Sequence, residues 1–161
     1  MSPDLDVITI GRASVDPYGQ RIGSRLEDMA SFGKAVGGCP ANIAIGTARL
    51  GLKSGIITRV GNEHFGRFIQ EQMVREGGAV DGICTDPDRS TALAILGVRT
   101  RDSFSLLFYR TDSADAALHE EDIDPAFIQR ALSILVTGSH LLRPHAAAAH
   151  RKAMTQIRES G

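Results

Sequence analysis

The sequence predicts an α/β fold in which two kinds of β-strand alternate. Short apolar runs at residues 54–60 and 134–138 are followed by helical stretches, which is typical of parallel strands buried between helices. Two longer runs, at residues 91–98 and 104–109, are separated only by a polar turn and predict a hairpin in a separate sheet. We therefore expect a parallel sheet between helices, in three α/β/α layers, with a small separate β-sheet.

The first 36 residues predict one buried strand and two exposed ones. Residues 6–10 form an apolar run that ends at Gly11, as expected for a strand covered on both faces. Residues 18–22 and 31–36 are more polar, so we expect them to form exposed strands. We assign these two segments to the small separate sheet.

A glycine-rich turn introduces the first helix. The segment 37–40 reads Gly-Gly-Cys-Pro, and a helical stretch follows from residue 41 to residue 50. Proline suits the first turn of a helix, because its missing N–H has no partner there in any case. Gly51 suits the position just after the helix end.

The rest of the chain continues the alternation of strands and helices. Apolar residues from Phe65 to Met73 recur at helical spacing, and a Gly-Gly pair at 77–78 ends that helix. Residues 80–84 predict a short strand. A short helix should begin at the Asp-Pro pair 124–125, and an Ala-rich helix should run from Pro144 to Arg158.

The composition is that of an ordinary globular protein. Hydrophobic residues make up 42% of the 161 residues, charged residues make up 23%, and the net charge is −1. This charge, with no Trp, argues against a nucleic-acid or membrane partner. No signal peptide or membrane span is predicted, and the two cysteines have no metal-binding or redox spacing. We expect a cytoplasmic protein with reduced thiols.

The segment 37–44, Gly-Gly-Cys-Pro-Ala-Asn-Ile-Ala, has the features of a ligand-binding turn. Gly37 and Gly38 would allow close approach of the backbone, and the helix start presents free N–H groups. Asn42 can both donate and accept hydrogen bonds, which suits a polyhydroxylated ligand. The alternative is a plain glycine turn before a helix, with Asn42 as a capping amide.

This segment, with the Leu-Gly pair at 50–51, resembles the N-terminal signature of the ribokinase-like (PfkB) sugar kinases. Gly11 and Asp16 are similar to the family's Gly-x-x-x-x-Asp, and residues 60–66 are similar to its Val-Gly-x-Asp-x-x-Gly. Glu63 replaces the second aspartate, which should affect only a helix cap. The resemblance extends from residue 6 to the last residue. It implies a ribokinase-like fold, C-terminally truncated, in a family that transfers phosphate from ATP to a primary hydroxyl of a sugar.

The resemblance also assigns roles to individual residues. It makes Asp16, Gly37, Gly38 and Asn42 the sugar-binding residues, with the Asp16 carboxylate accepting hydrogen bonds from sugar hydroxyls. On general grounds an Asp that precedes Pro17 is more often a turn residue. The position of Asp16 after the first predicted strand, upstream of the glycine segment, favours the binding role.

Arg110 points to an acid substrate. The segment Phe-Tyr-Arg-Thr-Asp-Ser-Ala at 108–114 resembles the acid-sugar branch of the family, and a guanidinium matches a carboxylate in a bidentate pair. Residues 10–16 are most similar to the kinases that act on 5-dehydro-2-deoxygluconate in inositol breakdown, and Arg12 would assist Arg110. In 2-keto-3-deoxygluconate kinases we would expect tyrosines at the positions of Ala94 and Phe108. A 2-keto-3-deoxygluconate kinase is therefore the alternative activity rather than the first one. A surface arginine at a strand end is the plain alternative.

Parts of the kinase machinery are missing from the sequence. There is no Gly-x-x-x-x-Gly-Lys-[Ser/Thr] loop and no Gly-Ala-Gly-Asp segment, which in the family carries the catalytic base. We therefore interpret residues 1–161 as the N-terminal part of one domain, with lid strands around 18–36 and 91–110. The ATP-binding part would be absent, and no catalytic residue is assigned. ATP and Mg²⁺ would serve the complete enzyme and would not bind this part tightly.

The remaining expectations concern partners and alternatives. We expect a sugar or sugar acid as ligand and, through the lid, a homodimer. Other ribokinase- or fructokinase-like activities are alternatives, as is a non-catalytic sugar-binding or lid-mediated interaction fragment. The five histidines, His140 among them, show no metal-binding spacing, so we expect ordinary surface or capping roles for them and no metal site.

Overall fold

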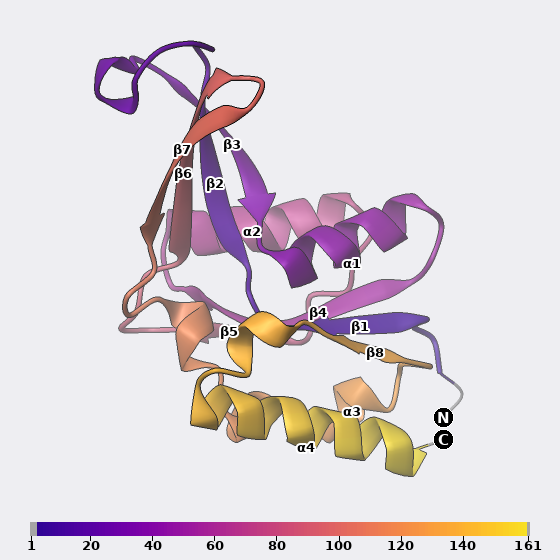
Figure 1. Cartoon of the computed structure of the whole chain (residues 1–161). Helices are drawn as coiled ribbons and strands as arrows, with labels where there is room; N and C mark the ends of the chain where they lie inside the picture. Colours follow the sequence, from indigo (N-terminus) through magenta and orange to yellow (C-terminus); the bar gives the residue numbers. More distant parts are fainter. Residues whose placement is uncertain (1–2, 161) are drawn as a thin grey trace.

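A parallel sheet runs through the centre of the body in the computed structural model, which describes residues 3–160 (Figure 1). Its strands lie in the order β5-β4-β1-β8, and every neighbouring pair is parallel. The strands are β1 (Val7–Ile10), β4 (Ser54–Gly61), β5 (Ile83–Asp86) and β8 (Ile134–Val136). The predicted parallel α/β sheet is therefore confirmed.

Helices cover both faces of this sheet, which gives the three predicted layers. Figure 1 shows α1 (Cys39–Arg49) and α2 (His64–Arg75) on one face, with α3 (Pro125–Ile128) and α4 (Pro144–Ser160) on the other. Successive residues of β4 point to opposite faces, as the pleat of a strand requires. Ile56 accordingly packs in the core with α1 and α2, and Ile57 packs in the core that contains Phe127 of α3.

The lid is a second sheet that projects from the body (Figure 1). Its strands lie in the order β3-β2-β6-β7, with β2 and β6 parallel and the outer pairs antiparallel. The hairpin of β6 and β7 matches the prediction. The lid strands are β2 (Ser14–Gly19), β3 (Phe32–Gly37), β6 (Ala92–Thr100) and β7 (Ser103–Tyr109).

Short 3₁₀ helices connect these elements. They are η1 (Leu26–Asp28), η2 (Ala114–Ala117), η3 (Glu120–Asp122) and η4 (Gly138–His140). Two of them matter for the site: η2 follows the last lid strand, and η4 follows β8. The chain returns from the lid to the body at η2, whereas η4 lies within the body, between β8 and α4.

Two strands differ in position from the prediction. β2 begins at Ser14 instead of residue 18, because Ser14 and Val15 are buried side chains that extend the strand into the body. β5 begins at Ile83 instead of residue 80, because Val80 closes a turn by accepting a backbone hydrogen bond from Ile83 at 2.9 Å. The first shift places Asp16 inside a strand.

Helix ends follow the signals in the sequence. Gly38, with φ of 95°, precedes α1, and Gly51, with φ of 90°, follows its end, so both take a conformation that favours glycine. Glu63 caps α2, because its carboxylate accepts hydrogen bonds from the backbone N–H of Phe65 (2.6 Å) and Gly66 (3.2 Å). The capping role predicted for Glu63 is confirmed.

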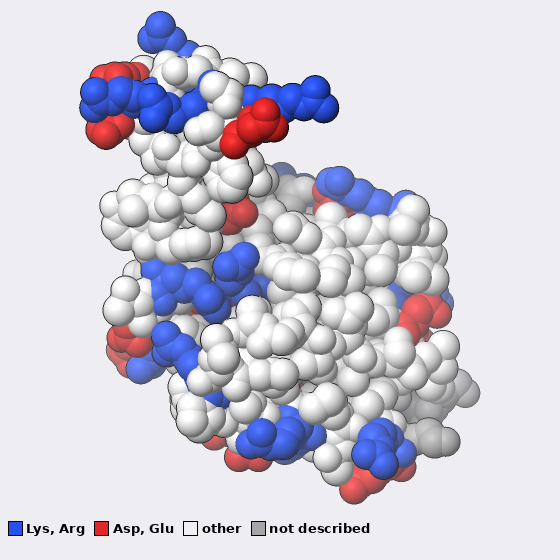
Figure 2. All heavy atoms as spheres, in the orientation of Figure 1, with Lys and Arg blue, Asp and Glu red and all other residues white. Residues whose placement is uncertain are grey.

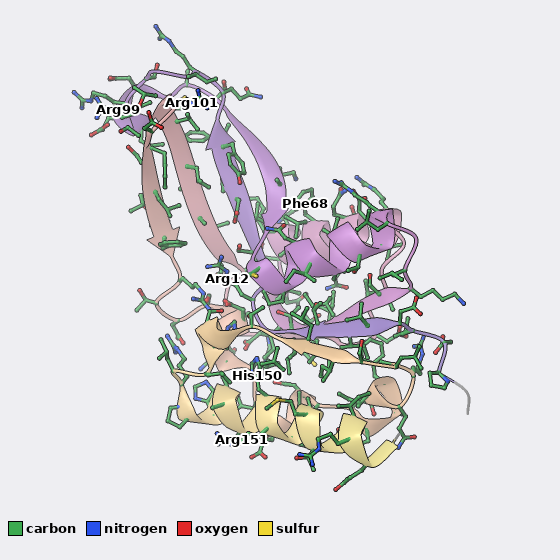
Figure 3. The ribbon with its side chains drawn as sticks, turned by 45° about the vertical axis from the view of Figure 1, so that its right-hand side comes forward. Arg12, Phe68, Arg99, Arg101, His150 and Arg151 are labelled. Atoms are coloured by element: carbon green, nitrogen blue, oxygen red, sulfur yellow. The ribbon has the colours of Figure 1, made fainter. Side chains whose placement is uncertain are left out.

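Charged side chains are unevenly distributed over the surface. Figure 2 shows basic and acidic side chains gathered at the far end of the lid, and further basic side chains where the lid meets the body. Arg99 and Arg101 belong to the first group (Figure 3). None of the helices formed by residues 3–160 is long and apolar enough to cross a membrane.

Candidate functional site

Asp16 lies on β2 beside the glycine pair that ends β3. A Cβ atom on Gly37 would overlap the carboxylate of Asp16, and one on Gly38 would overlap the carbonyl oxygen of Arg12. The two glycines therefore make room for Asp16 and for the turn before it. From the sequence we expected Gly37 and Gly38 to let the backbone approach a ligand. In the structure the backbone of Gly37 instead lies close to the Asp16 carboxylate.

The surroundings of Asp16 alter its acidity. The side chain is half-buried, and the Ser14 hydroxyl donates a hydrogen bond to one of its oxygens at 2.9 Å. Burial raises the pKa of Asp16 above its ordinary value of 3.8, and this effect outweighs the hydrogen bond from Ser14 and the nearby charge of Arg12, which both lower it. The second carboxylate oxygen has no hydrogen-bond donor among the described residues, so it is available to a ligand.

Asn42 lies in the first turn of α1 and is exposed. Its backbone N–H donates to the carbonyl of Gly38 at 2.9 Å, while its side chain lines a pocket of about 360 Å³ between α1, α2 and β3. Phe68 of α2 forms part of the wall, and the ammonium of Lys34 sits 4.1 Å from the centre of the Phe68 ring. Asn42 does not act as the helix cap, because the residue at that position is Gly38.

Arg110 follows the last lid strand and is held by buried groups. Its Nε and Nη2 atoms donate to Oδ2 of Asp115 at 3.0 and 2.9 Å, and Nη2 also lies 3.0 Å from Nε2 of His140. The side chain of Asp115 is fully buried, and that of His140 is 1% exposed, whereas Arg110 keeps 27% of its side chain exposed. Arg110 is thus neither a free surface residue nor fully available for a bidentate contact.

Strand register relates Arg110 to Asp16. Val15 of β2 is paired with Leu93 of β6, and Ala94 of β6 is paired with Phe108 of β7. Paired residues share a face of a sheet, so Asp16, Ala94 and Phe108 lie in one row across the lid. Arg110 comes two residues after Phe108, which predicts that it approaches the same face, roughly 10 Å (two strand spacings) from the Asp16 strand.

Arg12 lies beneath this row. Its guanidinium carbon is 5.9 Å from the centre of the Phe108 ring, and Figure 3 shows Arg12 where the lid meets the body. This contact also shows that Phe108 faces the body. Arg12 and Arg110 therefore flank Phe108, although no direct contact brings the two arginines together.

Comparison with known proteins identifies the family. Residues 4–161 match the family described as pfkB family carbohydrate kinase. This chain belongs to the PfkB family of carbohydrate kinases. The resemblance seen in the sequence is thereby confirmed.

Two curated PfkB relatives carry the same name. A 5-dehydro-2-deoxygluconokinase from Listeria monocytogenes is 37% identical over 157 residues, and one from Geobacillus kaustophilus is 38% identical over 158 residues. These matches cover 97% and 98% of this chain but 48% and 47% of the relatives. The chain thus spans about half the length of the curated relatives it matches.

Solved PfkB structures have the same fold. A PfkB protein from Polaromonas sp. JS666 superimposes with a TM-score of 0.89 at 32% identity, over 98% of this chain and 53% of that one. A protein described as a ribokinase II from Escherichia coli, in complex with ATP and Mg²⁺, has a TM-score of 0.89 at 26% identity, over 98% and 50%. The ribokinase-like fold expected from the sequence is confirmed.

Sequence reasoning missed the groups around Arg110. Asp115 carries no motif that we recognised, and Ser113 was given no role of its own within the segment 108–114. His140 was expected to have an ordinary surface or capping role. In the structure His140 is buried beside Gly11, where a Cβ atom would stand 3.0 Å from Nδ1 of the imidazole. The available signal was the spacing of Ser113 and Asp115 shortly after Arg110, in a segment too short to form a further strand.

Proposed function

We propose that this PfkB chain forms the sugar-binding part of an ATP-dependent kinase for 5-dehydro-2-deoxygluconate, the acid sugar of inositol catabolism. The observation that carries the proposal is the row of Asp16, Ala94 and Phe108 across the lid, with Arg110 following Phe108 at the end of β7. The names of the curated relatives support the same substrate. Such a kinase would act in the cytoplasm.

Each proposed binding residue has a role that its chemistry supports. Asp16 would accept hydrogen bonds from sugar hydroxyls. The exposed amide of Asn42 lines a separate pocket with Lys34 and Phe68, so we propose that it binds a polar group there. Gly37 would leave the space that the Asp16 carboxylate occupies, and Gly38 would leave space for the backbone of Arg12. Arg110, assisted by Arg12, would bind the substrate carboxylate, a group that neutral sugars lack.

The lid would shield this site from water. Covering the sugar with β2 and β6 excludes water from the acceptor hydroxyl and so limits wasteful hydrolysis of ATP. ATP with Mg²⁺ would supply the phosphoryl group in the complete enzyme, as the complex of the E. coli relative supports. Within residues 3–160 no group of three or more His, Cys, Asp or Glu side chains is placed to hold a metal ion, so we assign no Mg²⁺ ligand to them.

A homodimer through the lid is the second part of the proposal. β7 is an edge strand that exposes apolar side chains on both faces, including Leu107 (45%) and Tyr109 (59%) on the face opposite Phe108. Burying these side chains against a second copy would remove them from water and protect the open edge.

Substitution of Arg110 tests the acid-sugar assignment. In a full-length kinase that carries these residues, Arg110→Ala should lower kcat/KM for 5-dehydro-2-deoxygluconate by about ten- to a hundredfold, because a charge-assisted contact is lost. Arg110→Lys should recover only part of this loss, since a single ammonium cannot keep the contacts to Asp115 and His140 and also reach the ligand. Slow turnover of neutral sugars such as fructose should stay nearly unchanged.

The matched control is Arg99→Ala, which removes an exposed arginine from the far end of the lid (Figure 3). It should leave both substrates unaffected. If Arg110→Ala instead lowers turnover of acid and neutral sugars equally, Arg110 only supports the lid and the acid-sugar assignment fails.

A further inference from the structure

The hydrogen-bond donors of Arg110 are mostly occupied by the protein itself. A guanidinium has five N–H groups. The N–H of Nε and one N–H of Nη2 point to Asp115, and the second N–H of Nη2 points to His140. The two N–H groups of Nη1 have no partner among the residues that the structure describes. With 27% of the side chain exposed, Arg110 can present this one nitrogen to a ligand.

Asp115 is a carboxylate fixed in a buried position. Besides Arg110, the hydroxyl of Ser113 donates to its other oxygen. Burial alone would raise the pKa of Asp115, but the hydrogen bond from His140, the charge of Arg110 and the Ser113 hydroxyl together hold it below its ordinary value. Asp115 therefore stays ionised, and a buried ionised carboxylate requires its cationic partner to remain in contact.

His140, which belongs to η4 of the body, completes the cluster with Arg110 and Asp115. Its ring stacks against that of His150 with 5.9 Å between centroids, and Gly11 leaves room for it. Figure 3 shows His150 between α4 and the sheet. Nε2 of His140 can accept the N–H of Arg110 at 3.0 Å or donate to Asp115 at 3.3 Å. In either tautomer His140 contacts Arg110 and Asp115. Through His140, η4 therefore holds Arg110, the residue that follows β7.

We propose that Asp115 and His140 are positioning residues, which hold Arg110 so that its Nη1 meets the carboxylate of an acid substrate. The inference rests on the proposed function and deepens it. A guanidinium fixed before binding loses little conformational freedom when the ligand arrives, and this preorganisation strengthens binding. Asp115 and His140 should therefore strengthen the binding only of ligands that carry a carboxylate.

Calorimetry on the purified chain tests this inference with two ligands. The first is 5-dehydro-2-deoxygluconate, and the second is the same sugar with a primary alcohol in place of its carboxylate. Asp115→Asn and His140→Leu should each weaken binding of the acid about five- to tenfold and leave binding of the alcohol unchanged. His140→Gln is the matched control, because its amide oxygen can still accept from Nη2.

A second measurement needs no substitution and so does not depend on the variants folding. The Nε–H proton of Arg110 should give a slowly exchanging NMR signal in the unmodified chain, and the signal should persist when the acid is added. Loss of this signal on binding would mean that the substrate pulls Arg110 away from Asp115, which would overturn the inference.

The remaining outcomes separate the inference from the function on which it rests. Equal weakening of both ligands in Asp115→Asn would make the cluster a structural support of the lid. Tighter acid binding in that variant would show that Asp115 competes with the substrate. Either result overturns the positioning role but leaves the acid-sugar site in place. An unmodified chain that binds neither ligand would refute the proposed function and the inference together.

Discussion

At the scale of single residues, Gly37 is the position of the candidate site that directly limits where the Asp16 carboxylate can lie. Its missing side chain leaves the space that the Asp16 carboxylate occupies. The backbone and the carboxylate belong to neighbouring strands, whose register pairs Ser14 with Gly37. Any larger residue at position 37 must therefore displace Asp16.

Gly37→Ala should abolish most sugar binding without unfolding the chain. The new methyl group would push the Asp16 carboxylate out of place, and we expect at least a tenfold loss of affinity by calorimetry, since displaced geometry costs whole hydrogen bonds. Gly46→Ala is the matched control. Gly46 lies inside α1 with open space around it, so alanine there should leave binding intact and add about 0.4–1 kcal/mol of stability.

At the scale of secondary-structure elements, Glu63 joins the body to the lid. Besides capping α2, its carboxylate accepts the backbone N–H of Thr91 at 3.2 Å, just before β6. The hydroxyl of Thr91 in turn accepts the backbone N–H of Gly61 at 3.0 Å. Although burial would raise the pKa of Glu63, the hydrogen bonds from Thr91, Phe65 and Gly66 hold it below its ordinary value. Glu63 thus stabilises the fold in its ionised form.

Glu63→Ala should lower the free energy of unfolding by about 1–2 kcal/mol, because a helix cap and a contact to β6 are lost together. Urea denaturation measures the change. Since the pKa is lower in the folded chain, this stabilisation is present above the unfolded pKa and is lost as the pH falls through the folded one. The difference between the two proteins should therefore shrink in acid, and a constant difference would exclude the ionised cap as its cause.

The same scale shows what the sequence could predict and what it could not. The helix starts at Pro40 and Pro125 and the hairpin of β6 and β7 depend on local signals, and all were predictable. The start of β2 was not, because Ser14 and Val15 join the strand through burial against the body. The contact between Arg110 and His140 joins residues 30 apart, and no local spacing reports such a contact.

At the scale of the whole molecule, the lid carries the proposed sugar site on the face of Asp16 and Phe108 and exposes Leu107 and Tyr109 on the opposite face. We expect the purified chain to self-associate through β7, and sedimentation velocity at increasing concentration measures this directly. Leu107→Glu should shift the protein to a monomer, because it places a charge on the face opposite Phe108. Ile22→Glu, at another exposed apolar residue (78%) outside the lid strands, is the control and should still associate. Monomeric behaviour of the unmodified chain would contradict the proposed dimer.

The central claim is that Asp16 binds the hydroxyls of an acid sugar on this chain, and calorimetric titration of 5-dehydro-2-deoxygluconate into the unmodified chain and Asp16→Asn tests it most directly. An ionised carboxylate accepts hydrogen bonds on both oxygens, whereas an amide offers one. The unmodified chain should bind the ligand, and its affinity should fall in acid, starting at a higher pH than for an ordinary aspartate, because burial raises the pKa of Asp16. Asp16→Asn should bind at least tenfold more weakly at neutral pH. Equal affinity of the two proteins would contradict the claim.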